Sequence, residues 1–185
     1  MALNVPILFI IFNRPDTTEV VFDEIRKAKP PKLFIAADGS RAGRDDEYQK
    51  CLDARSIIKK VDWNCDVHTL FRENNLGCKG AVSSAIDWVF DNVEEGIILE
   101  DDCVPDQSFF LFCQVLLEKY RHDSRVMMIS GDNFQDGINR GDGSYYFSKF
   151  AHIWGWASWR RAWNMYDVNI KSFPNFLCSD KINDV

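Results

Sequence analysis

The stretch GIILEDDCVP, residues 96–105, joins a short apolar run to three consecutive carboxylates, Glu100, Asp101 and Asp102. A brief apolar run bounded by turn-forming residues is typical of a strand that is covered on both faces. Neighbouring anions repel one another, and each loses hydration if the strand end is buried. The cluster is therefore either a solvated turn after the strand or a place where a positive charge is held.

The same alternation of patterns extends along the chain on both sides of this stretch. Strands are predicted at 5–12, 32–37, 66–71, 96–100 and 125–130, and helices at 13–28, 45–60, 74–90 and 106–120. Asp16 and Glu19 have the spacing of a capping box, and Asp106 is predicted to cap the last of these helices. This order predicts a single α/β domain, residues 1–185, with three α/β/α layers around a mostly parallel sheet.

Polar residues follow four of the predicted strands. They are Asn13-Arg14, Asp38-Gly39, the acidic triplet and Asp132-Asn133. Ligands of open α/β sheets bind beyond the carboxyl ends of the strands, and parallel strands place those ends on one edge. The sequence therefore predicts a binding site at this edge.

Composition limits the classes of partner. The 185 residues are 46% hydrophobic and 27% charged, with a net charge of −6, which is typical of a globular protein and argues against nucleic-acid binding. The acidic balance still permits a small anionic ligand held together with a metal. No leader or membrane-spanning run is expected, although peripheral membrane association stays open. The six cysteines form no CxxC pair, Cys113 falls in an apolar helical pattern, and a reducing cytoplasm is favoured.

Carboxylates in the triplet are suited to a hard divalent cation, Mn²⁺ or Mg²⁺, which commonly bridges protein carboxylates to phosphate oxygens. The alternative is a surface turn, since Asp is common after strands and Pro105 ends this one.

The other strand-end residues each have two readings. Asp38 can accept a hydrogen bond from a base or ribose while Gly39 lets a ligand approach, or the pair forms a simple turn. Arg14 can hold a phosphate, or can form a surface ion pair with Asp16 or Glu19. Lys79 is more simply a solvated lysine.

The segment AHIWGWASWRRAW, residues 151–163, is rich in tryptophan. Trp156, Trp159 and Trp163 have i, i+3, i+7 spacing, which predicts a core-facing helical stripe. Trp154 and Trp156 flank Gly155, so one of them is a candidate for stacking on a sugar. His152 is interpreted as structural.

Taken in order, ILFIIFNRP, FIAADGS, NLGCKGAVSSAIDWVF, IILEDDCVPDQSFF, MMISGDN and WGWASWRRAW resemble a glycosyltransferase of the GT-A fold, a Rossmann-like nucleotide-diphospho-sugar transferase. More narrowly, the chain is similar to the N-acetylglucosaminyltransferase that initiates complex N-glycans and to bacterial proteins of this kind. The resemblance runs from about Val5 to Trp163. Its most specific part is the acidic triplet followed by Pro-Asp and an aromatic helix.

The resemblance implies a role for each matching residue. Asp102 matches the direct metal ligand, and Glu100 and Asp101 match contacts to the donor sugar and ribose. Arg14 matches an arginine near the phosphates. Asp38 matches the acid that recognises uracil, and Gly39 lies next to it in the nucleotide-binding set. Gly155-Trp156 matches a loop near the donor sugar.

The resemblance also implies metal-dependent hexosyl or N-acetylhexosaminyl transfer from a nucleoside diphosphate sugar, expected to be UDP-linked, to a glycan, lipid or protein acceptor. The donor-binding part is expected at about 4–135, with the acceptor-side region incomplete. No catalytic base is assigned, because nothing in the spacing selects Asp167 or Asp180. Two alternatives stay open: a sugar-phosphate nucleotidyltransferase and a non-catalytic nucleotide-sugar-binding module.

Overall fold

The computed structural model describes residues 2–135, 137–138 and 141–178. The strands are β1 (Ile7–Ile11), β2 (Lys32–Ala37), β3 (Asp66–Phe71), β4 (Glu95–Glu100), β5 (Ile129–Ser130) and β6 (Trp156–Trp159). The helices are α1 (Pro15–Ala28), α2 (Asp45–Arg55), α3 (Gly77–Asn92), α4 (Gln107–Tyr120), α5 (Arg160–Trp163) and α6 (Phe173–Leu177), with a 3₁₀ turn η1 (Ser56–Lys60) after α2.

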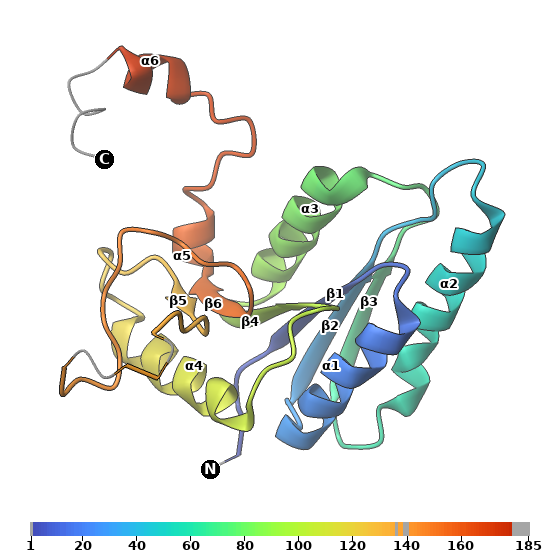
Figure 1. The fold of residues 1–185 in the computed structure, drawn as a ribbon, viewed down its shortest axis with the longest axis horizontal. Helices are drawn as coiled ribbons and strands as arrows, with labels where there is room; N and C mark the ends of the chain where they lie inside the picture. Colours follow the sequence, from blue (N-terminus) through green and yellow to red (C-terminus); the bar gives the residue numbers. More distant parts are fainter. Residues whose placement is uncertain (1, 136, 139–140, 179–185) are drawn as a thin grey trace.

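One six-stranded sheet organises these elements, in the order β3-β2-β1-β4-β6-β5 (Figure 1). Strands β1 to β4 are parallel to one another. Helices α1, α2 and α4 pack on one face, where Phe9, Phe22 and Leu117 are buried. Helix α3 covers the other face, where Phe34 and Phe90 are buried. The predicted α/β/α architecture with a mostly parallel sheet is confirmed.

Strand β6 lies between β4 and β5, although β5 precedes it in sequence. It is antiparallel to both neighbours, and its register pairs Trp156 with Ile98 of β4 and with Ser130 of β5. Because β6 runs opposite to β4, its first residues lie beside the carboxyl end of β4. The chain that precedes β6 therefore reaches the edge at which the acidic triplet lies.

The predicted helical stripe of tryptophans is wrong in its secondary structure, although two of the three rings are buried as expected. Trp156 and Trp159 lie in β6, and only Trp163 belongs to a helix, the single-turn α5. Residues three apart in a strand point to opposite faces, so Trp156 packs with α3 and Trp159 packs on the α4 side. Pairing with β4 supplies partners for the backbone of this segment and so overrides its local periodicity.

Two predicted helix starts have different outcomes. Asp106 caps α4, because its Oδ1 accepts a hydrogen bond from the Ser108 backbone N–H at 2.8 Å. The predicted capping box at α1 is wrong: the N-cap residue is Arg14, with no side-chain cap. Pro15 starts that helix before Asp16, because proline needs no hydrogen-bond acceptor at the first helical position.

Other boundaries are shorter than predicted. The expected strand at 125–130 is reduced to the two residues of β5, and the expected helix at 45–60 changes to a 3₁₀ turn at Ser56. Cys113 is fully buried as predicted, and all six cysteines are free thiols.

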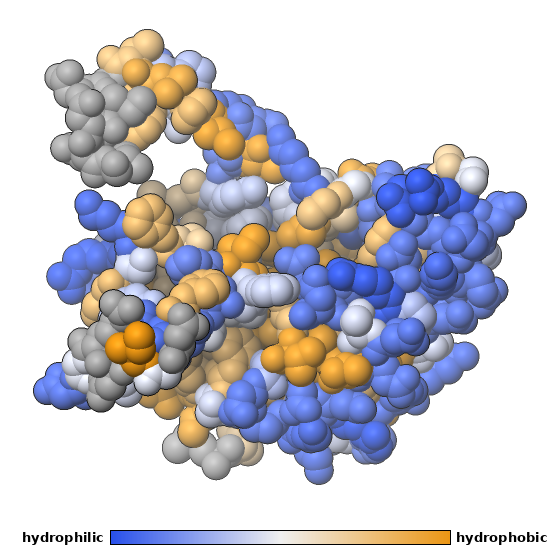
Figure 2. Space-filling view, viewed as in Figure 1, coloured by the Kyte–Doolittle hydropathy of each residue, from blue (hydrophilic) through white to orange (hydrophobic). Residues whose placement is uncertain are grey.

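The chain after α5 extends away from the sheet and ends, within the described residues, in α6 (Figure 1). Figure 2 shows hydrophobic residues on this projecting segment, where Met165, Ile170 and Phe173 are exposed. Across the described ranges, every helix is too short or too polar to cross a bilayer.

Candidate functional site

The carboxyl ends of β1, β2 and β4 lie on one edge of the sheet, as the sequence predicted, because these strands are parallel. Strand β5 has the same direction as β4, since β6 is antiparallel to both. Asp132 therefore reaches this edge as well, and its Oδ2 accepts a hydrogen bond from the Trp154 backbone N–H at 3.4 Å. Residues 13–14, 38–39, 100–102 and 132 are thus gathered along one rim.

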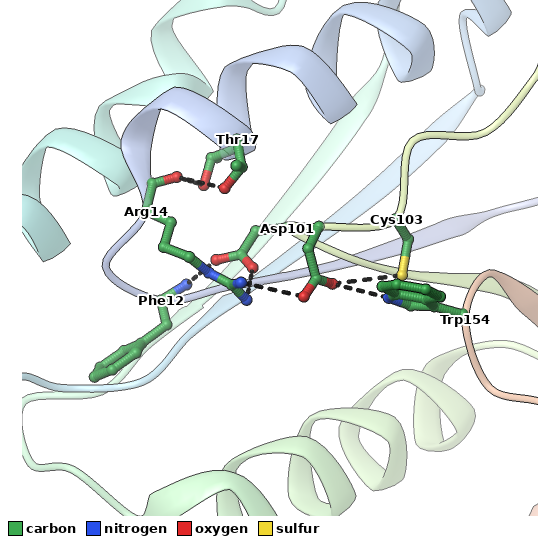
Figure 3. Close-up of polar contacts among 8 residues, drawn as sticks. Phe12, Arg14, Thr17, Asp101, Cys103 and Trp154 are labelled. Atoms are coloured by element: carbon green, nitrogen blue, oxygen red, sulfur yellow. Dashed lines mark hydrogen bonds and ion pairs between the residues drawn. The ribbon is translucent and has the colours of Figure 1, made fainter.

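Arg14 supplies the positive charge for the acidic triplet. Its Nη2 lies 2.5 Å from Asp101 Oδ1, and its Nη1 lies 3.1 Å from Asp102 Oδ2. Figure 3 shows the guanidinium reaching from the β1–α1 junction toward both carboxylates. The alternative ion pairs of Arg14 with Asp16 or Glu19 are absent among the described residues, and Glu19 pairs with Lys60 instead. One fork of donors therefore neutralises two of the three strand-end anions.

Trp154 and Arg14 contact different oxygens of the Asp102 carboxylate. Its indole Nε1–H donates to Asp102 Oδ1 at 3.3 Å. Gly155 has a φ of 77°, a left-handed conformation that favours glycine, and this turn separates Trp154 from the strand that follows. As a result Trp154 is 62% exposed while Trp156 is 7% exposed, although only one residue lies between them.

The three acids have different electrostatic environments. Burial raises the pKa of Glu100, and the charges of Asp102 and Asp101 raise it further. Burial also raises the pKa of Asp101, against the opposing effects of Arg14 and the Phe12 N–H. Burial opposes ionisation of Asp102 too, but the Trp154 hydrogen bond and the Arg14 charge outweigh it and lower the pKa of that carboxyl. Of the three carboxyl groups in the triplet, Asp102 alone has its pKa lowered from the ordinary value.

A buried carboxylate, Glu47 of α2, supports the loop that carries Arg14. Its Oε1 accepts from Asn13 Nδ2 at 2.9 Å, and its Oε2 accepts from the Arg41 backbone N–H at 2.7 Å. The Arg41 guanidinium also binds this carboxylate, and these hydrogen bonds lower the pKa of Glu47 to about 2. Glu47 thus ties the end of β1 to the segment that follows β2.

Asp38 and Gly39 are engaged by the protein itself. Asp38 is buried, and its carboxylate accepts from the backbone N–H groups of Leu76 and Gly77 and from Asn75 Nδ2, all at 3.0–3.1 Å. These groups form the start of α3, whose unpaired N–H groups favour an anion. A Cβ on Gly39 would lie 2.5 Å from the backbone of residues 73–74. The close approach for which Gly39 was predicted is made by the chain's own backbone.

The remaining predicted residues differ in where they lie. Glu100 ends β4, and strand alternation directs it to the α3 face. Trp156, expected near a donor sugar, lies in the core instead, since β6 is covered on both faces. Lys79 is exposed on α3, Asp167 accepts from the Asn169 and Lys171 backbone N–H groups, and Asp180 lies outside the described residues.

A cavity of about 1710 Å³ adjoins Asp102 on the side of α4. Aromatic residues line much of its wall, among them Phe109, Phe112, Tyr145 and Trp154, and Asp132 contributes a further carboxylate. Tyr145 is fixed there by Lys119 Nζ, 2.6 Å from its hydroxyl. The Lys119 and Tyr120 hydrogen bonds lower the pKa of Tyr145. The site therefore has a charged rim beside a partly apolar space.

The donor set at Asp102 fits a divalent cation that brings other ligands with it. Asp102 offers hard carboxylate oxygens and is about one-third exposed, at 34% of its side chain. Within the described residues no three His, Cys, Asp or Glu side chains are grouped as a complete metal site. A cation here needs most of its oxygen ligands from water or from a bound phosphate.

Comparisons with known proteins identify no family. No protein-family model and no curated protein matches the chain. Among solved structures, 4-diphosphocytidyl-2C-methyl-D-erythritol synthase from Anaerococcus prevotii DSM 20548 aligns with a TM-score of 0.45 and 12% identity, over 94% of this chain and 77% of that one. The mannosyltransferase PcManGT from Pyrobaculum calidifontis, solved with GDP-Man and Mn²⁺, aligns with a TM-score of 0.46 and 14% identity, over 69% of this chain and 35% of that one.

Neither likeness enters the case for a function, because both are distant in sequence and in structure. No comparison supports the narrower resemblance to the N-acetylglucosaminyltransferase of complex N-glycans, which stays a prediction.

The sequence did not predict two contacts of the site. One is the hydrogen bond from Trp154, a residue predicted only as a candidate for stacking, to Asp102. The other is the support that Glu47 gives to the loop before Arg14. The signal for Trp154 was the glycine after it, which interrupts the tryptophan pattern. Glu47 carried no local signal, because its partners Asn13 and Arg41 come from other segments of the chain.

Proposed function

We propose that the chain binds a nucleoside diphosphate sugar, expected to be UDP-linked, with Mn²⁺ or Mg²⁺, and transfers the sugar to an acceptor as a GT-A type glycosyltransferase. The observation that supports this most is the meeting of Arg14, Asp101, Asp102 and Trp154 at the carboxyl edge of the sheet, beside a cavity. A phosphate-binding cation, a carboxylate suited to a metal and an exposed aromatic ring are the groups that such a donor needs.

Each residue has a task that follows from its contacts. Asp102, whose pKa is lowered and whose side chain is partly exposed, would hold the cation through a carboxylate oxygen. When bound, the cation would supply positive charge for the departing diphosphate. Arg14 adds a guanidinium to the same phosphates. Asp101, only 4% exposed, anchors Arg14 near the strand end.

The exposed ring of Trp154 is the part of the site suited to a sugar. Its Nε1–H is used by Asp102, so its faces remain for apolar contact with a pyranose. The neighbouring cavity is the space for the acceptor. We do not place Asp38, Gly39 or Trp156 in contact with the ligand, because their observed contacts are internal.

Binding of UDP, measured by calorimetry with Mn²⁺ or with EDTA, tests this proposal. We expect Mn²⁺ to tighten UDP binding, and Asp102→Ala to remove that gain while changing UDP affinity in EDTA little. A matched control is Asp91→Ala, an exposed carboxylate on α3. UDP affinity that is independent of metal and unchanged in Asp102→Ala would contradict the site.

Turnover separates the remaining readings. Release of UDP from UDP-sugars in the presence of candidate acceptors supports the transferase. Pyrophosphate-dependent formation of a nucleoside triphosphate would support a nucleotidyltransferase instead. The junction Asn13-Arg14-Pro15 after β1 carries no glycine-rich phosphate loop, so this rival has less support. Metal-dependent UDP binding without either reaction would indicate a binding module.

A further inference from the structure

Both oxygens of the Asp102 carboxylate have hydrogen-bond partners within the protein. Oδ2 lies 3.1 Å from Arg14 Nη1, and Oδ1 accepts from Trp154 Nε1 at 3.3 Å. The Cys103 thiol also lies 3.6 Å from Oδ1. A carboxylate oxygen can accept more than one bond, but a divalent cation at a little over 2 Å from either oxygen would lie beside one of these partners.

Arg14 is the partner that opposes a cation most. A doubly charged ion on Asp102 Oδ2 would lie within a few ångströms of the guanidinium, and like charges at that distance repel even at a partly exposed site. The indole N–H of Trp154 carries no net charge and presents a weaker obstacle. Cation binding at Asp102 is therefore disfavoured while Arg14 pairs with this carboxylate.

Arg14 is much more exposed than its partner Asp101, so it is the residue that can exchange Asp102 for a ligand. Its side chain is 51% exposed, whereas Asp101 is 4% exposed and is held by the Phe12 backbone N–H at 3.2 Å. Asp101 is thus buried and held by the backbone, whereas the Arg14 guanidinium is accessible to a ligand. A diphosphate offers this fork of donors more negative charge than Asp102 does. Movement of Arg14 onto a phosphate would free Asp102 Oδ2.

We propose that Arg14 excludes divalent cations from Asp102 until a diphosphate arrives, so that nucleotide and metal bind in a coupled manner. This inference rests on the proposed function, because it assumes that the site takes a nucleoside diphosphate. Arg14 is then a gate for the metal as well as a phosphate ligand. The coupling is reciprocal: the metal tightens nucleotide binding by the same factor by which nucleotide tightens metal binding.

The test measures free and bound Mn²⁺ by electron paramagnetic resonance, with and without UDP. We expect wild-type protein to bind Mn²⁺ weakly alone and at least about tenfold more tightly with saturating UDP, which is a typical coupling between two sites. In Arg14→Met, Mn²⁺ alone should bind about tenfold more tightly than to wild type, and the enhancement by UDP should shrink.

Two further variants keep the result interpretable. Arg26→Met removes an exposed arginine of α1, the helix that Arg14 precedes; Arg26 is paired with Asp62 away from the site, so both Mn²⁺ affinities should stay unchanged. Arg14→Lys keeps the charge but replaces the fork by a single point donor, so it should retain exclusion of Mn²⁺ with weaker coupling. This variant serves if Arg14→Met does not fold, since the loss of Arg14 leaves Asp101 buried without its cation.

Failure of the gate is distinguishable from failure of the proposed function. If Arg14→Met binds Mn²⁺ alone no better than wild type while UDP still enhances Mn²⁺ binding, the gate is wrong and the site stands. If wild-type Mn²⁺ binding is unaffected by UDP and by Asp102→Ala, the proposed metal site itself is wrong, and the gate is wrong with it.

Discussion

Replacing Gly39 by alanine separates two explanations of the Asp-Gly pair after β2. The sequence suggested that Gly39 leaves room for a ligand, whereas the structure shows it against the protein's own backbone. A Cβ at this position would lie 2.5 Å from Asn74 C and from Glu73 O. Real Cβ contacts are not that short, and backbone cannot rotate away as a side chain does, so the β2 and β3 ends must separate.

The expected loss of stability follows from that overlap. Overpacking a well-packed position costs roughly 1–3 kcal/mol, and contact with backbone atoms places Gly39→Ala toward the upper end, at about 2–3 kcal/mol. For a chain of this length, the melting temperature should fall by roughly 4–12 °C. Gly80→Ala is the matched control, because Gly80 lies inside α3 and its nearest atom to a Cβ is Leu76 Cβ at 3.4 Å. Alanine there should stabilise by roughly 0.5–1 kcal/mol through helix propensity.

The two explanations of Gly39 are distinguished by calorimetric melting of both variants. UDP titration then follows at a temperature where both variants are folded. We expect Gly39→Ala to be destabilised and Gly80→Ala to be slightly stabilised. A Gly39→Ala protein with wild-type melting temperature and weakened UDP binding would refute the structural reasoning. It would show that Gly39 is needed for a ligand rather than for the close approach of two backbone segments.

Other substitutions test further contacts. Removing the cap in Asp106→Ala frees the Ser108 N–H and should lower the melting temperature by a few degrees, with UDP affinity unchanged. The folded-state pKa of Glu47 is lowered to about 2, so its ionised form stabilises the fold above pH 4.5, and this contribution is lost as pH falls from about 4.5 to about 2. The stability difference between wild type and Glu47→Gln should therefore narrow over that range; a constant difference in acid melting curves would contradict the assignment to Arg41. The buried Cys113 thiol should be alkylated by iodoacetamide only on unfolding, whereas the exposed Cys78 should be alkylated in the native protein; rapid alkylation of Cys113 in native protein, located by peptide mass mapping, would show that α4 is not packed as observed.

The acidic triplet illustrates how far the sequence leads and where it stops. Residues 96–105 predict that the triplet follows a buried strand. Because parallel strands end on the same edge of a sheet, the sequence also predicts that the triplet and Arg14 share that edge. The sequence did not show that Arg14 pairs with Asp101 and Asp102, because these residues are 87 and 88 positions away. Local spacing offered only Asp16 or Glu19 as ion-pair partners of Arg14, and the tertiary structure pairs it with Asp101 and Asp102 instead.

The sequence by itself determined the elements whose pattern is local: the apolar strands β1 to β4, the helices between them and the Asp106 cap. Apolar runs and capping residues act within a few positions, so short-range physics decides them. Only the tertiary structure decided that the segment at Trp156 becomes a strand between β4 and β5. Its backbone hydrogen bonds are made with β4, some sixty residues earlier, and a pattern within the segment cannot predict a partner so far away. The same pairing brings Trp154 to Asp102, so the candidate site is completed by a contact that exists only in the folded chain.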